Sequence, residues 1–220
     1  MSRHVLVINA GSSSLKYSLV DADSGVQPGG GLVERIGDEG ASITHQGPTG
    51  EHRDQRTIAD HEEALRLALA AFDEHGPSLA DAEIQAIGHR VVHGGDRFSA
   101  PTLVDDQLLD VVSSLVPLAP LHNPANIEGV QVALRVFPDL PQVAVFDTAF
   151  HQTIPPAAYT YAVPRAWEQE HGVRRYGFHG TSVAFVARAA AALLGRPATS
   201  VNLIVLHLGN GASATAVAGG

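Results

Sequence analysis

The chain has 220 residues, of which 45% are hydrophobic, and a formal net charge of −9. This length fits one large domain or two small ones with a packed core. The negative charge argues against nucleic-acid binding, the lack of cysteine excludes disulfides and a thiol nucleophile, and no apolar run reaches the roughly 18 residues of a membrane helix. The N-terminus does not have a signal-peptide layout, so we expect a soluble, cytoplasmic protein.

The first motif is a predicted β-hairpin with a donor-rich tip. Residues 5–8 are apolar and residues 15–20 alternate, which predicts two strands joined by a polar turn. Gly11 in this turn lets the backbone approach a ligand, and successive N–H groups can converge on a phosphate. Asn9 offers a neutral oxygen for Mg²⁺, and Lys16 is the only lysine in the chain. A Ser-rich surface turn would look the same, so both interpretations stay open.

The elements that follow predict an α/β domain. Asp60 and Glu63 form a capping pattern before a helix, and Asn123 is the expected cap of another helix, with Pro124 at its first position. In chain order we expect a Gly turn at 29–31, strands at 32–36 and 41–45, an edge hairpin at 47–57, a helix at 61–74, a strand from 84 to the Gly94-Gly95 turn, helices at 105–116 and 124–137, and a strand at 142–146.

A charged side chain interrupts the apolar strand that starts at residue 84. Strand side chains alternate between faces, so His89, Val91 and His93 share one face while Arg90 and Val92 share the other. An arginine in such a strand is costly unless it meets an anion. The pattern indicates either contact with an anionic ligand or an internal salt bridge for Arg90.

Two further residues lie where chemistry is often placed. Asp147 follows an apolar strand, a position that bears catalytic groups in α/β folds but that also suits a helix or turn cap. His179 precedes an Ala-rich helix predicted over 181–194, with Gly180 or Thr181 as the cap. An anion is favoured at such a helix start.

The end of the chain repeats the pattern of its beginning. Residues 202–208 and 213–217 predict two strands around a Gly-Asn-Gly-Ala-Ser turn, as in the opening hairpin. Such a duplication suggests two related domains facing each other across a nucleotide cleft. A Pro- and Tyr-rich stretch near residue 154 separates the predicted domains 1–150 and 151–220. Because one hairpin cannot bury a core, we interpret the chain as the N-terminal part of a longer protein.

Six segments, in order along the chain, resemble the acetokinase family, the acetate kinases. They span almost the whole sequence, and together they are highly specific. The segments are Asn9-Ala-Gly-Ser-Ser-Ser-Leu-Lys16, Gly88-His-Arg-Val-Val-His-Gly-Gly95, Pro120-Leu-His-Asn-Pro124, Phe146-Asp-Thr-Ala-Phe-His151, Tyr176-Gly-Phe-His-Gly-Thr-Ser182 and His207-Leu-Gly-Asn-Gly-Ala-Ser213.

The resemblance implies an α/β fold with duplicated ribonuclease H-like domains, as in actin, Hsp70 and sugar kinases, the second domain being incomplete here. It implies reversible, Mg²⁺-dependent phosphoryl transfer from ATP to acetate, giving acetyl phosphate and ADP, in a homodimer. It also implies that Arg90 grips the carboxylate or phosphoryl oxygens, that His179 donates to the transferring group, and that Asp147 orients Arg90 or a metal-bound water.

The resemblance further implies a set of binding residues. Val92, Leu121 and Phe178 would line the pocket for the acetate methyl group, and Asn9 would lie near Mg²⁺. ATP phosphates would be contacted by residues of the two turns, namely Ser12, Ser14, Lys16, His207, Gly209, Asn210 and Gly211. Further family residues would lie beyond position 220, so we expect the 220-residue chain alone to be inactive and to fold poorly after about residue 150.

Two alternatives remain. A sister enzyme acting on propionate or butyrate would carry similar motifs, because one methylene changes discrimination by only about 1–3 kcal/mol. An actin-like nucleotide-binding module without transferase activity is the other alternative. Arg90, Asp147 and His179 argue against it, since ATP binding alone does not need all three.

Overall fold

The computed structural model describes residues 3–209 and 211–220, which divide into two compact units. The first unit comprises Met1–Val91 and Thr102–Ala144, and the second comprises Val92–Pro101 and Val145–Gly220. Each unit is described by itself below. The domain boundary expected at residue 150 stays a prediction.

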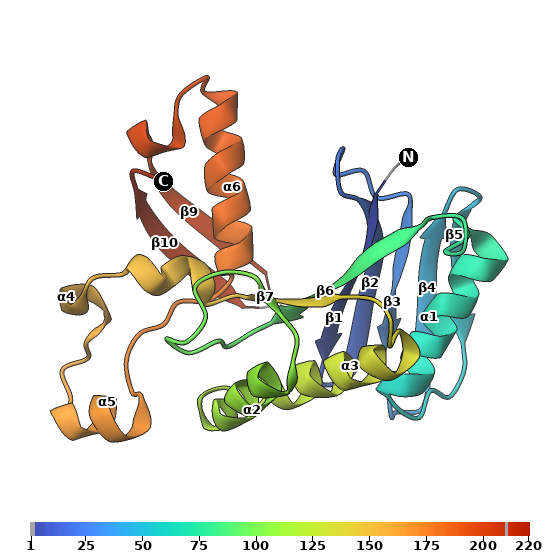
Figure 1. The fold of residues 1–220 in the computed structure, drawn as a ribbon, viewed down its shortest axis with the longest axis horizontal. Helices are drawn as coiled ribbons and strands as arrows, with labels where there is room; N and C mark the ends of the chain where they lie inside the picture. The colour runs from blue at the N-terminus through green and yellow to red at the C-terminus, as the bar shows by residue number, and fades with distance from the viewer. Residues whose placement is uncertain (1–2, 210) are drawn as a thin grey trace. The chain divides into compact units, whose positions relative to one another are not determined.

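A mixed sheet organises the first unit (Figure 1). Its strand order is β5-β4-β3-β2-β1-β6-β8-β7. The pairs from β1 to β5 are antiparallel, as the sequence predicts, whereas β1 and β6 are parallel. The strands are β1 (His4–Gly11), β2 (Ser14–Asp21), β3 (Gly29–Glu34), β4 (Ser42–Gly47), β5 (Gly50–Gln55), β6 (Ile84–Val91), β7 (Thr102–Leu103) and β8 (Gln142–Phe146).

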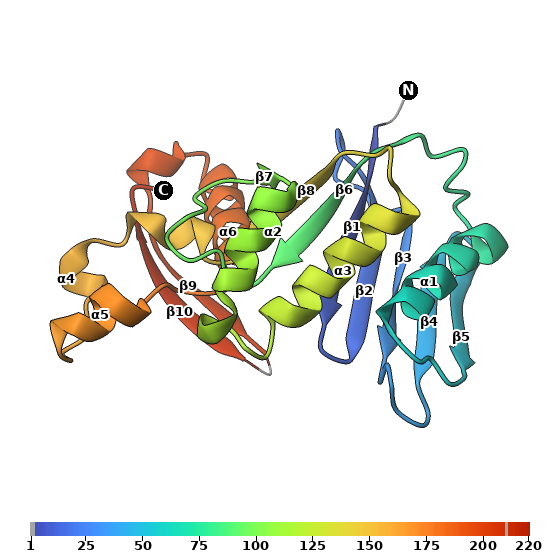
Figure 2. The same ribbon diagram turned by 60° about the horizontal axis from the view of Figure 1, so that its bottom comes forward.

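Helices α1 (His61–His75) and α3 (Asn123–Val136) cover one face of this sheet, and α2 (Asp106–Ser114) packs against α3, before a short 3-10 turn at Val116–Leu118 (Figure 2). The predicted cap of α1 is confirmed. The Asp60 carboxylate accepts from the Glu63 backbone N–H at 2.8 Å, and the Glu63 carboxylate accepts from the Ala59 N–H at 2.7 Å. The apolar side of α1 then packs into the core with Leu65 and Phe72.

Two local predictions in the first unit are wrong. Gly29–Gly31 form part of β3 instead of a turn, because a Cβ at Gly31 would lie 2.2 Å from the Thr44 carbonyl oxygen and only glycine allows the strands to approach so closely. Asn123 is the first residue of α3 and not its cap, which is His122. The Asn123 side chain is instead buried and faces the Val112 carbonyl at 3.5 Å.

The second unit centres on α6 (Gly180–Leu193), which packs against the antiparallel hairpin of β9 (Asn202–Leu208) and β10 (Ala212–Ala218). Val183, Ala187, Val205 and Val217 form its core cluster. The remaining elements are the 3-10 turns Ala149–Thr153 and Ala198–Ser200 and the helices α4 (Pro156–Tyr159) and α5 (Arg165–His171). Within the described ranges, no helix is long and apolar enough to cross a membrane.

Candidate active site

The tip of the β1–β2 hairpin has the tight geometry that its sequence suggests. Gly11 pairs with Ser14 across a two-residue turn, and Asn9 pairs with Lys16. A Cβ at Gly11 would come within 2.9 Å of the Ser14 Oγ, so the two residues approach each other closely across the turn. Ser12, in the turn itself, is exposed. The tip therefore presents polar groups beside the only lysine of the chain.

Two buried polar side chains of the helices hold this tip, and neither is among the residues predicted from the sequence. The Asn126 amide of α3 donates to the Ala10 carbonyl at 2.6 Å, and His61 of α1 donates through Nε2 to the Gly11 carbonyl at 2.7 Å. Gly129 lies so close that a Cβ there would be 2.6 Å from the Ala10 Cβ. The only feature of the sequence that indicates such a contact is an asparagine, Asn126, on the apolar side of a predicted helix. Helices α1 and α3 thus fix the backbone of the hairpin tip.

Arg90 lies next to this hairpin tip in the sheet. Ile8 of β1 pairs in parallel with His89 of β6, and both are buried, so Asn9 and Arg90 follow side by side on the other face. Asn9 and Lys16 are cross-strand partners and share that face. Three predicted site residues from β2, β1 and β6 therefore meet where the parallel strands end, as ligand sites in α/β folds do.

The other face of β6 is buried, as the alternation predicts. His89 in β6 and His93 just beyond its end are 3% and 1% exposed, whereas Arg90 in β6 and Val92 after it are half-buried. His89 donates through Nε2 to the Gln142 side-chain oxygen at 2.7 Å. Burial lowers the pKa of His89, and this hydrogen bond offsets only part of the effect. His89 is therefore a neutral, structural histidine at pH 7.

In the second unit, the segment that follows β8 docks onto the residues before α6. Asp147 is 1% exposed, its carbonyl accepts from the Gly180 N–H at 2.9 Å, and its carboxylate accepts from the Thr181 hydroxyl at 3.2 Å. A Cβ at Gly180 would be 2.3 Å from that carbonyl oxygen. His151 donates through Nε2 to the Phe178 carbonyl at 3.0 Å. Asp147 is thereby held against the start of α6.

His179 is itself the N-cap of α6, which corrects the prediction of Gly180 or Thr181. Its φ of 57° lies in the left-handed region, which is uncommon for a residue with a side chain and is concentrated at functional sites. The Gly180 N–H donates to the Asp147 carbonyl, and the backbone changes direction at His179, directly before the helix begins. The side chain therefore stands at the positive end of the helix dipole, where an anion is favoured.

The turn between β9 and β10 approaches the same ring. The imidazoles of His179 and His207 stack with centroids 4.1 Å apart and planes 17° apart. The His179 Nδ1 lies 2.8 Å from the Ser213 Oγ. In the turn, the Gly209 N–H donates to the Gly211 carbonyl at 3.0 Å, and Asn210 lies outside the described residues. His179 and the predicted ATP-contacting residues His207 and Gly211 thus belong to one cluster.

The predicted methyl pocket is only partly assembled within one unit. In the second unit, the buried His93 ring lies edge-on to Phe178, with centroids 5.6 Å apart, and Val92 is its chain neighbour. The Gly95 N–H donates to the His93 Nδ1 at 3.0 Å, and burial lowers the pKa of His93, so the ring is neutral. Leu121 belongs to the first unit and is 76% exposed. Its place beside the other two stays a prediction.

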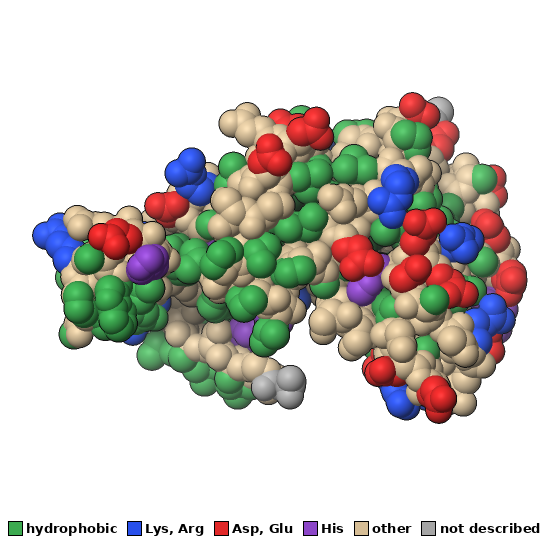
Figure 3. Space-filling model, turned by 90° about the horizontal axis from the view of Figure 1, so that it is seen from below, with side chains coloured by type: hydrophobic (Ala, Val, Ile, Leu, Met, Phe, Trp, Pro, Cys, Tyr) green, Lys and Arg blue, Asp and Glu red, His purple; other side chains and the backbone are tan. Residues whose placement is uncertain are grey.

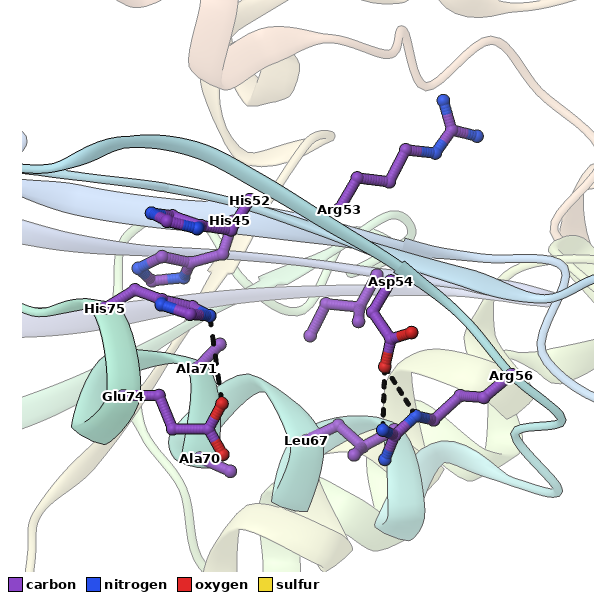
Figure 4. A pocket seen from close by; sticks show the side chains of 11 residues that line it. His45, His52, Arg53, Asp54, Arg56, Leu67, Ala70, Ala71, Glu74 and His75 are labelled. Atoms are coloured by element: carbon purple, nitrogen blue, oxygen red, sulfur yellow. Dashed lines mark hydrogen bonds and ion pairs between the residues drawn. The ribbon is translucent and has the colours of Figure 1, made fainter.

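A separate pocket of about 290 Å³ lies between β4, β5 and α1 (Figure 4). His52 and His75 stack there, with parallel rings 3.8 Å apart. Arg56 is paired with Asp54 at 2.7 Å, and His75 lies 3.8 Å from Glu74. None of the predicted site residues lines this pocket, so it is distinct from the candidate active site.

The described parts of the chain contain no group of three His, Cys, Asp or Glu residues that could hold a metal. Mg²⁺ bound mainly through nucleotide phosphates needs only one or two protein oxygens. The half-buried Asn9 can supply such an oxygen next to the phosphate-binding candidates Ser14 and Lys16. On the face drawn in Figure 3, acidic and basic side chains are interspersed.

The sequence and the fold both match known proteins. The model of the acetokinase family matches residues 4–220. The acetate kinase of Leifsonia xyli is 56% identical over 216 residues, covering 98% of this chain and 54% of that protein. The acetate kinase of Streptomyces coelicolor is 53% identical and covers the chain fully and 54% of that protein. The chain thus spans about half the length of these curated relatives.

Solved structures of two related kinases have the same fold as this chain. The Porphyromonas gingivalis acetate kinase superposes with a TM-score of 0.91 at 40% identity, covering 99% of this chain and 55% of that one. A propionate kinase from Francisella tularensis also gives 0.91 at 39% identity, with 100% and 55% covered. These matches confirm the α/β fold class, a mixed sheet flanked by helices. Because the family model covers nearly the whole chain, the chain belongs to the acetokinase family.

Proposed function

We propose that this protein catalyses reversible phosphoryl transfer between ATP and acetate. The observation that carries the proposal is the placement of Asn9, Lys16 and Arg90 on one face, where β2, β1 and β6 meet. This arrangement combines an oxygen ligand, a cation for phosphate and a planar guanidinium for a carboxylate. Membership of the acetokinase family, and the similarity to the two acetate kinases described above, support this assignment.

The proposed reaction does not need a strong general base. The carboxyl group of acetate has a pKa of roughly 4, like that of Asp or Glu, so the nucleophile is already ionised at pH 7. The remaining task is to align two anions and to stabilise the charge on the transferring group. Arg90 would hold the carboxylate or phosphoryl oxygens through paired N–H groups. His179, at the start of α6, would donate to the equatorial oxygens in the transition state.

The remaining roles follow the same proposal. Asp147, fixed by Thr181, would orient Arg90 or a metal-bound water. Asn9 would help to hold Mg²⁺, which supplies charge neutralisation on the ATP phosphates when bound. The turn residues Ser12, Ser14, Lys16, His207, Gly209, Asn210 and Gly211 would contact those phosphates, and Val92, Leu121 and Phe178 would enclose the methyl group. The family resemblance also leads us to propose a cytoplasmic homodimer.

A longer acid is the second candidate substrate. The similarity to a propionate kinase, with a TM-score of 0.91, is the observation that favours it. Discrimination by one methylene is worth only about 10–200-fold.

Hydroxamate formation from Mg-ATP and acetate, propionate or butyrate separates these candidates. We expect the protein as its gene encodes it to give the highest kcat/KM with acetate. A higher value with propionate or butyrate would move the assignment to the sister activity. ATP binding without acyl phosphate from any acid would instead indicate a nucleotide-binding module.

A further inference from the structure

The His179 ring is held by a hydroxyl group to which the proposed function gives no role. Ser213, the second residue of β10, places its Oγ 2.8 Å from the His179 Nδ1. A second serine contacts the stacked partner: Ser182, in the first turn of α6, places its Oγ 3.0 Å from the His207 Nδ1. Each ring of the stacked pair therefore has a serine hydroxyl at its Nδ1: Ser213 of β10 at His179, and Ser182 of α6 at His207.

The backbone and the neighbours of His179 leave the ring little freedom. The Gly180 N–H is bound to the Asp147 carbonyl, which fixes the chain directly after His179. The His207 ring covers one side at 4.1 Å, and a Cβ at Gly211 would lie 3.8 Å from the His179 Cε1. Ser213 contacts Nδ1, so this hydrogen bond bears both on the rotation of the ring in its plane and on which nitrogen carries the proton.

We propose that Ser213 is a positioning residue that holds His179 with an N–H on Nε2 available to the transferring phosphoryl group. This inference rests on the proposed function, in which His179 donates to that group. A serine suits the task because its hydroxyl can donate or accept. It donates to Nδ1 of a neutral ring, which leaves the proton on Nε2, and it accepts from the Nδ1–H of an imidazolium.

Loss of the hydroxyl has a defined chemical consequence. Without a donor at Nδ1, a neutral His179 is free to carry its proton there, and Nε2 then becomes an acceptor. An acceptor lone pair facing a phosphoryl oxygen repels it, so transition-state stabilisation falls while ground-state binding by other groups remains. Ser213→Thr keeps the hydroxyl, and Ser213→Ala removes it with little change in volume.

The direct test reads the imidazole nitrogens. Two-bond ¹H–¹⁵N spectra of the histidine-labelled protein report the protonated nitrogen of each ring, and the His179 signal is assigned by its loss in His179→Gln. We expect Ser213→Ala to change the His179 nitrogen shifts, Ser213→Thr to preserve them, and Ser182→Ala to change His207 while leaving His179 as in the wild type. Identical His179 shifts in Ser213→Ala and wild type would overturn the proposal.

The second readout is steady-state kinetics, measured on the product of the complete gene. Ser213→Ala should lower kcat by roughly tenfold with both KM values within about twofold, and Ser213→Thr should recover most of the rate. Ser200→Ala, whose hydroxyl donates to the Pro197 carbonyl remote in sequence from the motif, is the control. Full kcat in Ser213→Ala would contradict the positioning role.

A variant that does not fold, and a failure of the proposed function, can each be distinguished from a failure of this proposal. If Ser213→Ala does not fold, Ser213→Cys, with a thiol that is a weak hydrogen-bonding group, takes its place with the same expectations. If the wild type makes no acyl phosphate from acetate, propionate or butyrate, the proposed function fails. The nitrogen spectra then decide alone whether Ser213 sets the state of His179.

Discussion

At the scale of single residues, the carboxylate of Asp147 shows how a buried acid is positioned. It is 1% exposed and accepts a hydrogen bond from the Thr181 hydroxyl at 3.2 Å. We expect Thr181→Val to lower the free energy of unfolding by about 1–2 kcal/mol, because a buried charge loses a donor. It should also lower kcat by roughly tenfold, since the carboxylate then loses one of the contacts that orient it.

The matched variant is Thr181→Ser, which keeps the hydroxyl and should retain most of the stability and rate. Chemical denaturation and steady-state acyl phosphate formation measure the two effects. Equal behaviour of Thr181→Val and Thr181→Ser would show that the hydroxyl does not position Asp147.

Buried histidines make stability depend on pH. Burial lowers the pKa of His45, His89 and His93 in the folded chain. Below the ordinary histidine pKa of about 6.5, the unfolded chain therefore binds more protons than the folded one. Their stabilising contribution is complete above that pH and is lost as the pH falls towards the lowered values, by up to about 1.4 kcal/mol per pH unit for each group.

We predict that the urea midpoint is lower at pH 5.5 than at pH 7.5. His89→Gln, which can still donate to Gln142, should show a smaller difference between the two pH values. The exposed His171→Gln is the control and should match the wild type. A midpoint that does not change between these pH values would contradict the assignment of neutral buried histidines.

At the scale of elements, the hairpin tip depends on the two helices beneath it. Asn126 donates to the Ala10 carbonyl at 2.6 Å, and both groups are buried. Asn126→Asp keeps the shape but brings an acceptor against an acceptor. We therefore expect a loss of about 1–3 kcal/mol in the free energy of unfolding and, if the proposed role of this turn in phosphate binding is correct, a several-fold higher KM for ATP, because the turn shifts.

A variant of the same helix isolates this effect. Gln131 is exposed on α3, and Gln131→Ala should leave both the stability and the KM for ATP close to the wild-type values. An Asn126→Asp protein with an unchanged KM for ATP would show that the tip keeps its conformation without α3, or does not bind phosphate.

The sequence predicts elements well where the signal is local. The β1–β2 hairpin, the alternation along β6 and the Asp60 cap of α1 are confirmed, because each depends on neighbours a few residues away. The predictions for Gly29–Gly31 and Asn123 are wrong because contacts with Thr44 and Val112 decide their structure. The same holds at the site. The motifs single out Arg90 and His179 as candidates, and the sixth motif contains Ser213. That Ser213 contacts His179, and that Asn126 contacts Ala10, is decided by packing between elements.

At the scale of the whole molecule, one face of the β9–β10 hairpin stays exposed. Ile204, Leu206 and Leu208 are 77%, 59% and 75% exposed, and all three lie on β9. Contiguous apolar surface of this kind promotes association. We predict that the 220-residue polypeptide alone forms no measurable acetyl phosphate and self-associates at micromolar concentrations.

Sedimentation and hydroxamate assays of the purified polypeptide measure both outcomes. Ile204→Thr with Leu206→Thr should reduce the association, whereas Val26→Thr, at a residue 60% exposed in the first unit, should not. A measurable rate from this polypeptide would mean that the described residues already suffice for catalysis.

The most direct test of the proposed chemistry compares acetate-dependent acyl phosphate formation by the wild type with that of Arg90→Ala and His179→Ala proteins that fold normally. We predict strong activity in the wild type and a loss of at least about a hundredfold in each variant, since both groups are proposed to act on the transferring phosphoryl group. His171→Ala, at an exposed position, should keep full activity. Near-wild-type rates in the Arg90 and His179 variants would contradict the central claim that these motif residues carry the chemistry.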